Sequence, residues 1–254
     1  MKLLKKLIAV AVMVPSLAFA AEATIPLDKA PDRINDLPAL QNGAKLFINY
    51  CLNCHSASVM RYNRLTEIGL TEEQIKNNLL FTGTKTGDLM TIAMAPRDAK
   101  SWFGAAPPDL SVIARAKSSG AGPGPDWLYT YLRTFYKDDA RTTGWNNLLF
   151  ANVGMPHVMW DLQGVQTARF DDVTDPHDPS KTIKKFAGFE QVTPGKLSRI
   201  EYDSAMADLV GYLQWMSEPA QNTRKRLGVI VLLCLSVFAF LAWRLNAAYW
   251  KDIK

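Results

Sequence analysis

Two cysteines and a histidine near residue 50 have the types and spacing that attach a porphyrin. Cys51 and Cys54 are three positions apart, and His55 directly follows the second cysteine. In this C-x-x-C-H pattern each thiol can add to one vinyl group on the same porphyrin edge, and the histidine can ligate the iron. We therefore predict one haem c, attached covalently through Cys51 and Cys54, with His55 as an axial ligand.

Two other uses of a cysteine pair fit this chain less well. A thioredoxin-like redox pair follows a strand, whereas the sequence before Cys51 has helical periodicity. A tetrahedral zinc site needs a second pair of ligands, and the only other cysteine is Cys234, inside an apolar run. Haem attachment is therefore the favoured interpretation.

The N-terminus has the pattern of an export signal. Three lysines precede an apolar stretch at residues 7–17, and a small-x-small cleavage pattern ends at Ala20. We predict a secretory signal peptide over residues 1–20 and a mature chain that begins at Ala21. Export agrees with the haem motif, because bacteria attach c-type haem outside the cytoplasm.

A second apolar run predicts a membrane anchor near the C-terminus. Residues 227–243 carry no charge, and as a helix they would cover about 26 Å of a hydrocarbon core about 30 Å thick. Flanking basic and aromatic residues favour a spanning helix over a buried helix of a soluble core. We predict an exported haem domain (21–223), a transmembrane anchor (224–246) and a cytoplasmic tail (247–254). The chain would cross the bacterial inner membrane once, with its haem domain in the periplasm.

The charge balance argues against nucleic acid as a partner. The whole chain has a net charge of +5, but the excess cations lie in the predicted signal and around the predicted anchor. Acidic residues outnumber basic ones in the exported domain, which therefore suits a cationic protein partner better. Four aspartates at positions 171–178 form either a docking surface or an ordinary solvated loop.

Apolar periodicity and capping patterns predict a mainly α-helical domain with few strands and long loop insertions. The predicted helices cover residues 40–51, 71–81 behind a capping box, 125–136 and 204–216. This pattern resembles the class I cytochrome c fold, in which the first and last helices cross near the haem. The resemblance would place Gly43 and Phe47 against Leu209 and Leu213. Gly43 could permit close approach there, or could simply be tolerated in the helix.

A second axial ligand would distinguish an electron carrier from a protein that binds gases or peroxide. His177 is set aside because it lies in the acidic, proline-rich loop. The candidates that are neither too close to His55 nor on the last helix are then Met90, Met94, Met155, His157 and Met159. Met155 stands between Gly154 and Pro156, in a segment that cannot be regular helix or strand and can present one side chain at a set angle. A thioether also suits iron that cycles between ferrous and ferric states. These arguments favour Met155 and leave Met94 and His157 as alternatives.

The chain resembles the cytochrome c1 family, the haem subunits of bacterial-type quinol–cytochrome c oxidoreductase. The resemblance rests on residues 49–56 (NYCLNCHS), 106–111 (APPDLS), 154–156 (GMP) and a C-terminal anchor that ends in 249–252 (YWKD). It implies Met155 as the axial ligand, because in the family the methionine follows the Pro-Pro-Asp-Leu-Ser stretch. It also implies that Pro108 lies in the haem pocket and that Arg115 or Lys117 pairs with a haem propionate. A lysine at 117 lacks the bidentate fork of an arginine.

The resemblance implies a one-electron relay. An iron–sulfur (Rieske-type) protein that oxidises quinol at a cytochrome b subunit would deliver electrons to this haem, which would reduce a soluble or tethered c-type cytochrome. The chain alone would be an electron carrier within a membrane-bound oxidoreductase. The alternatives are another membrane-tethered cytochrome c, such as an oxidase or denitrification subunit, a haem gas sensor, or a structural subunit whose haem is inert.

Overall fold

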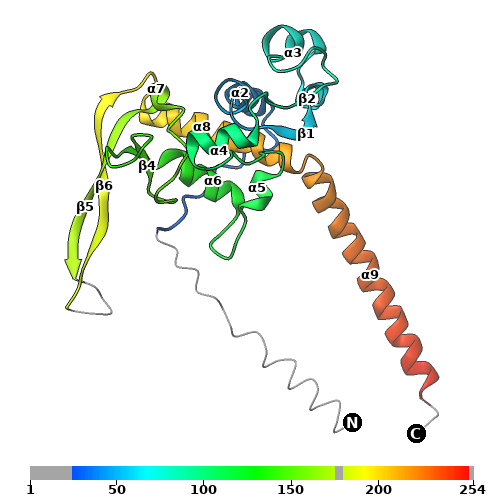
Figure 1. Ribbon diagram of the computed structural model, residues 1–254. Coiled ribbons are helices and arrows are strands. Elements are labelled where there is room, and N and C mark those ends of the chain that lie inside the picture. The colour runs from blue at the N-terminus through cyan, green and yellow to red at the C-terminus, as the bar shows by residue number, and fades with distance from the viewer. Residues whose placement is uncertain (1–24, 175–179, 252–254) are drawn as a thin grey trace. The chain divides into compact units, whose positions relative to one another are not determined.

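The computed structural model describes residues 25–174 and 180–251 (Figure 1). These residues divide into two compact units, and the chain passes between them several times. The first unit comprises the described residues up to Pro31, then Pro96–Ala106 and Arg115–Met206; the second comprises Asp32–Ala95, Pro107–Ala114 and the chain from Ala207. The predicted signal peptide, residues 1–20, lies outside the described residues.

The second unit begins with helices that the sequence predicts well. Its elements are α2 (Leu37–Leu46), a π-helical segment η1 (Phe47–Cys51), β1 (Ala57–Arg61), a 3-10 segment η2 (Tyr62–Ile68), α3 (Glu72–Asn78) and β2 (Leu89–Met90). Asp36 caps α2, accepting a hydrogen bond from the backbone N–H of Ala39 at 3.2 Å. The predicted capping box is present, since Thr71 and Gln74 each accept a hydrogen bond from the other's backbone N–H. Helix α3 ends earlier than predicted, at Asn78.

Gly43 is a point of close helix packing in the second unit. Helix α8 (Arg199–Ser217) contributes its part from Ala207 onward to this unit. A Cβ atom on Gly43 would overlap the carbonyl oxygen of Asp208 and lie 2.6 Å from Cβ of Tyr212. The rings of Phe47 and Tyr212 lie 5.5 Å apart. The predicted close approach is therefore correct, although the partners of Gly43 are the residues just before the two leucines that the prediction named.

The first unit contains more β-structure than the sequence predicts. Its elements are α4 (Pro96–Phe103), α6 (Gly124–Arg133), β3 (Phe135–Lys137), β4 (Trp145–Asn147), α7 (Trp160–Gln163), β5 (Gly164–Thr174), β6 (Thr182–Pro194) and the start of α8; the short α5 (Ile113–Ala116) falls at the unit boundary. Pro125 lies in the first turn of α6, as predicted. The prediction was wrong for Phe135 and Tyr136, which form β3 because they pair with Asn147 and Asn146 of β4.

Strands β5 and β6 form a long antiparallel hairpin (Figure 1) where we predicted a loop insertion. Register shifts after Val165 and Arg169 interrupt the two-residue alternation by which a strand is recognised in sequence. The hairpin also changes the interpretation of the acidic cluster. Asp171 and Asp172 belong to β5, and Asp172 forms an ion pair of 3.4 Å with Lys184 of β6. Asp172 is thus paired within the hairpin, whereas Asp175 and Asp178 of the acidic cluster lie outside the described residues.

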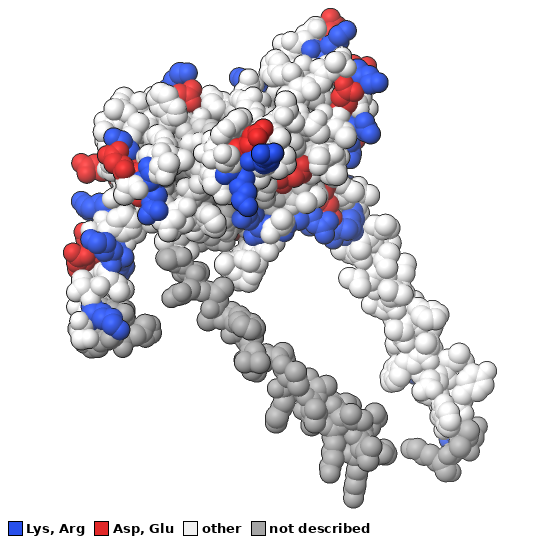
Figure 2. Space-filling view, in the orientation of Figure 1, with Lys and Arg blue, Asp and Glu red and all other residues white. Residues whose placement is uncertain are grey.

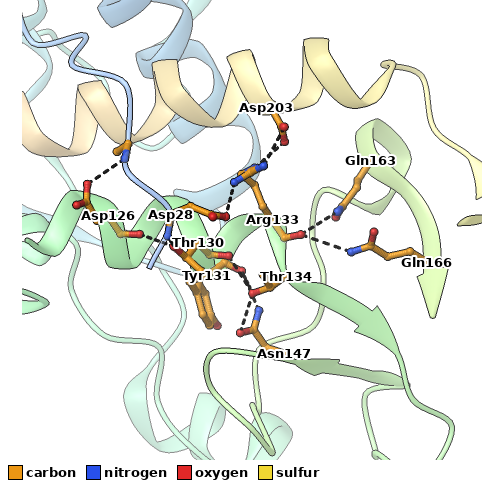
Figure 3. A network of polar contacts seen from close by, with 11 residues as sticks. Asp28, Asp126, Thr130, Tyr131, Arg133, Thr134, Asn147, Gln163, Gln166 and Asp203 are labelled. Atoms are coloured by element: carbon orange, nitrogen blue, oxygen red, sulfur yellow. Dashed lines mark hydrogen bonds and ion pairs between the residues drawn. The ribbon is translucent and has the colours of Figure 1, made fainter. Parts of the chain in front are cut away.

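Arg133, at the end of α6, is the centre of a polar network in the first unit (Figure 3). Its guanidinium group donates two hydrogen bonds to Asp203 of α8, at 2.6 and 2.9 Å, and one to Asp28, at 2.7 Å. Its backbone carbonyl accepts hydrogen bonds from the side-chain amides of Gln163 and Gln166, at 3.3 and 3.4 Å. One residue therefore connects the N-terminal segment, α6, α8 and the base of the hairpin.

Replacing Arg133 with methionine is expected to lower the free energy of unfolding by about 2 kcal/mol, because three charge-assisted hydrogen bonds are lost and Asp203 is left half-buried without its partner. Urea unfolding monitored by circular dichroism measures the change. A matched control is Arg64→Met, which removes an exposed bidentate pair with Glu67. That loss should stay below about 1 kcal/mol. Equal losses in the two variants would contradict the structural role of Arg133.

Helix α9 (Gln221–Tyr249) extends the predicted anchor at both ends. Its 29 residues would span about 44 Å, and it is long and apolar enough to cross a membrane. Figure 2 shows its surface as mostly uncharged, and nearly all its side chains are exposed. An apolar surface of this length is not stable in water, so α9 is suited to a lipid environment.

Candidate haem site

The two motif cysteines lie where a helix ends. Segment η1 ends at Cys51, whose carbonyl oxygen accepts hydrogen bonds from the backbone N–H groups of Cys54 and His55, at 3.1 and 2.9 Å. This turn brings the three motif residues to one end of the helix. Both cysteines are free thiols. Burial, together with the nearby Cys54, raises the pKa of the Cys51 thiol to about 12, so it remains protonated at neutral pH.

His55 has a defined orientation and tautomer. Its Nδ1 atom lies 2.7 Å from the backbone carbonyl oxygen of Pro108. A carbonyl oxygen can only accept, so Nδ1 carries the proton and Nε2 keeps its lone pair. Histidines that bind metals usually donate their other ring N–H to a carbonyl or carboxylate in this way. Burial lowers the pKa of His55, against smaller opposite effects of Pro108 and Asp109, which favours the neutral form that binds a metal.

The Pro-Pro-Asp-Leu-Ser segment is bound to the chain that follows the motif. Leu110 donates its backbone N–H to the carbonyl oxygen of Ser56 at 2.8 Å. The carboxylate of Asp109 accepts the backbone N–H groups of Ser58 and Ser111, each at 2.8 Å. Burial raises the pKa of Asp109, but hydrogen bonds from Ser111 and Ser58 outweigh it and leave the pKa below its usual value. These contacts hold the segment that supplies the hydrogen bond to His55.

Met155 lies in the first unit, in the irregular segment that the sequence predicts. Its side chain is half-buried. A Cβ atom on Gly154 would lie 3.0 Å from the carbonyl oxygen of Phe103, so the backbone approaches closely at this point. Tyr131 of α6 donates a hydrogen bond from its hydroxyl to Met155 Sδ at 3.4 Å. The Met155 sulfur therefore accepts a hydrogen bond from a side chain of the same unit.

Two buried asparagines shape the segment that leads to Met155. Asn147 accepts the backbone N–H groups of Leu149 and Phe150 with its side-chain oxygen, both at 3.0 Å. Asn146 accepts the N–H of Asn152 at 2.8 Å, and Asn152 has a left-handed backbone with φ of 61°. Neither asparagine, nor Tyr131, is predicted from the sequence as a residue of the site. An adjacent asparagine pair before Gly-Met-Pro was the only available signal, because asparagine often binds backbone groups of a nearby turn.

The structure distinguishes among the other candidates for the second axial ligand. Met90 and Met159 are fully buried and belong to the core. The imidazole of His157 is stacked on Phe135, with centroids 4.9 Å apart, and contacts Trp145 edge-on. Burial lowers the pKa of His157 to about 4, against smaller opposite effects of nearby side chains. His157 is thus a neutral core residue between aromatic rings.

Three other residues singled out from the sequence are less buried: the ligand candidate Met94 and the two propionate candidates, Arg115 and Lys117. Met94 is half-buried in the segment between β2 and α4. Arg115 is exposed in α5. The ammonium group of Lys117 lies 4.1 Å from the centre of the Trp127 ring and 5.8 Å from that of Phe150, within the range of cation–π attraction.

Comparison with known proteins identifies the family. A sequence model described as the Cytochrome C1 family matches residues 30–253. The chain belongs to the cytochrome c1 family. It is 45% identical over 245 residues to "Cytochrome c1" of Allochromatium vinosum, with 95% of both chains covered. It is 28% identical over 248 residues to "Cytochrome c1" of Rhodospirillum rubrum, covering 86% of this chain and 83% of the relative. A protein of Nitrosomonas europaea named "Ammonia monooxygenase gamma subunit" is 44% identical over 253 residues, which cover all of both chains.

Cytochrome c1 is the haem subunit of a quinol–cytochrome c reductase, and the chain is an electron-transfer subunit of this type. Members of the family bind haem c, and α9 makes this one a membrane-anchored subunit. The residues present fit the cofactor, since two free thiols stand beside a histidine whose Nε2 keeps a lone pair. The predicted family is confirmed. The predicted mainly helical fold, with a C-terminal helix of membrane-spanning length, is confirmed as well.

Proposed function

We propose that the chain carries one haem c, bound covalently through Cys51 and Cys54, with His55 and Met155 as the axial ligands of iron. Family membership supports the cofactor, and the C-x-x-C-H spacing supports the covalent bonds. The observation that carries the proposal is the 2.7 Å hydrogen bond between His55 Nδ1 and the Pro108 carbonyl oxygen. Because it fixes the proton on Nδ1, the other ring nitrogen is available to the iron.

Each proposed ligand has a separate task. The cysteines would hold the haem beside His55, and Pro108 keeps the imidazole in the tautomer that can ligate. Met155 provides a soft thioether, which favours a raised reduction potential. Bound haem c would supply reversible one-electron chemistry, while the protein sets the potential and the docking geometry.

Basic residues would neutralise the haem propionates. We assign this role to Arg115 or Lys117. Lys117 has the more restricted position, because its ammonium group lies over the Trp127 ring. Arg115 is exposed and carries the planar fork that pairs with a carboxylate through two hydrogen bonds.

The same proposal covers the cellular setting. Residues 21–223 would lie on the periplasmic side of the bacterial inner membrane, residues 224–246 would cross it, and 247–254 would be cytoplasmic. Electrons would come from an iron–sulfur (Rieske-type) subunit that works with a cytochrome b subunit, and would pass to a soluble or tethered c-type cytochrome. The chain alone would be an electron carrier, and quinol oxidation would belong to the assembled complex. The relatives named cytochrome c1 support this setting.

A second candidate follows from the Nitrosomonas relative. The name of that protein assigns it to an ammonia monooxygenase, and the similarity covers both chains completely. Under this alternative the chain would work with an ammonia-oxidising enzyme.

Isolation of the full chain from its native membranes in mild detergent tests the proposal. We expect one haem per chain, which stays on the protein in acidified acetone, and co-isolation with a b-type cytochrome and an iron–sulfur subunit. Haem that is extracted by acidified acetone would contradict covalent attachment. Co-isolation with ammonia-oxidising activity, in the absence of a b-type cytochrome, would favour the second candidate.

A further inference from the structure

The hydroxyl of Tyr131 is directed at the sulfur of Met155. The Oη–Sδ distance is 3.4 Å, and a thioether sulfur can only accept. Both residues belong to the first unit, Tyr131 on α6 and Met155 on the segment after β4. A thioether has two lone pairs, so one can bind iron while the other accepts this hydrogen bond.

The packing around Tyr131 fixes the direction of its hydroxyl. Its ring is stacked on Trp127, with centroids 4.9 Å apart and planes inclined by 15°. On another side it meets Phe135 edge-on, at 5.0 Å and 70°. Its backbone carbonyl accepts the side-chain amide of Asn147 at 2.8 Å. Asn147 also binds the backbone of the segment that leads to Met155, so donor and acceptor are held by the same support.

A hydrogen bond to a ligating sulfur changes the balance between the two oxidation states. The bond withdraws electron density from the thioether, which then donates less to iron. Ferric iron gains more from a donating ligand than ferrous iron does, so the hydrogen bond disfavours the ferric state. The expected consequence is a higher reduction potential.

We propose that Tyr131 is a positioning residue for the axial methionine, which orients the Met155 sulfur and raises the reduction potential of the haem. The proposal rests on the assignment of Met155 as ligand. Tyr131 would not touch the iron and would act only through the sulfur. The stack with Trp127 would determine where the hydroxyl points.

Tyr131→Phe in the full chain tests this role, because it keeps the ring and removes only the hydroxyl. At a fixed solution potential the ferric-to-ferrous ratio should rise about threefold, equivalent to a drop of ~28 mV for a one-electron couple. The charge-transfer band of sulfur-ligated ferric haem should remain, with a shifted position. Tyr136→Phe removes the same atom from a tyrosine that contacts Phe170 and Phe189, and it should leave potential and band unchanged.

Met155→Ala, measured in parallel, separates failure of this proposal from failure of the ligand assignment. If Met155→Ala loses the band while Tyr131→Phe keeps the parental potential and band, Tyr131 has no role and only the present proposal is overturned. If Met155→Ala keeps the band, the ligand assignment fails and the proposal falls with it. A potential lowered in Tyr131→Phe but not in Tyr136→Phe, together with a lost band in Met155→Ala, supports it.

Discussion

Replacing Met155 with alanine is expected to abolish the charge-transfer band at the red end of the ferric spectrum and to lower the reduction potential. The band requires a thioether on iron, and alanine offers no donor. A drop of at least about 100 mV is expected, within the roughly 0.8 V over which axial ligands tune haem. Visible spectroscopy of the ferric protein and a redox titration measure the two effects.

Two matched variants distinguish Met155 from its alternatives. Met94→Ala removes a half-buried methionine near another proline, and His157→Phe keeps an aromatic ring stacked on Phe135 while removing the imidazole. Both should retain the parental band. Loss of the band in either variant, with an unchanged spectrum in Met155→Ala, would transfer the ligand role to that residue.

Gly43→Ala is expected to destabilise the folded chain by about 3 kcal/mol or more. The added methyl group would overlap the backbone carbonyl of Asp208 and lie 2.6 Å from Cβ of Tyr212. A backbone carbonyl cannot turn aside as a flexible side chain can, so α2 and α8 would have to separate. Alanine favours a helix over glycine by about 1 kcal/mol, and the clash outweighs this gain. Thermal unfolding of the purified haem-containing chain measures the loss.

Gly228→Ala provides the matched control for this substitution. Gly228 is also a helical glycine, in α9, but a Cβ atom there meets nothing within 4 Å. The variant should be as stable as the parent or slightly more so. A Gly43→Ala protein with parental stability would show that the close contact between α2 and α8 does not constrain the fold.

Local patterns explain why much of the chain could be predicted. A capping box involves residues three apart, so Thr71 and Gln74 reveal the start of α3 without any knowledge of the fold. A proline in the first turn reveals the start of α6. In both cases the residues that interact are neighbours in sequence, and the physical cause is visible in the pattern.

The β-structure shows where such patterns fail. Phe135 and Tyr136 continue the apolar stripe of α6, yet they form β3 because they pair with Asn147 and Asn146, which lie twelve and ten residues further on. In the β5–β6 hairpin, bulges disturb the alternation that would have marked the strands. Strand pairing depends on a partner segment, so the residues of one strand do not reveal the pairing by themselves.

The sequence by itself determined the haem-attachment motif, the family resemblance and the apolar anchor, because thiol spacing and an uncharged run act over a few adjacent residues. Only the tertiary structure decided which carbonyl fixes the tautomer of His55, which hydroxyl meets the Met155 sulfur, and that His157 is enclosed by aromatic rings. Pro108 is 53 residues from His55, and Tyr131 is 24 residues from Met155. Contacts of this kind follow from how distant segments pack, so residue types alone do not specify them.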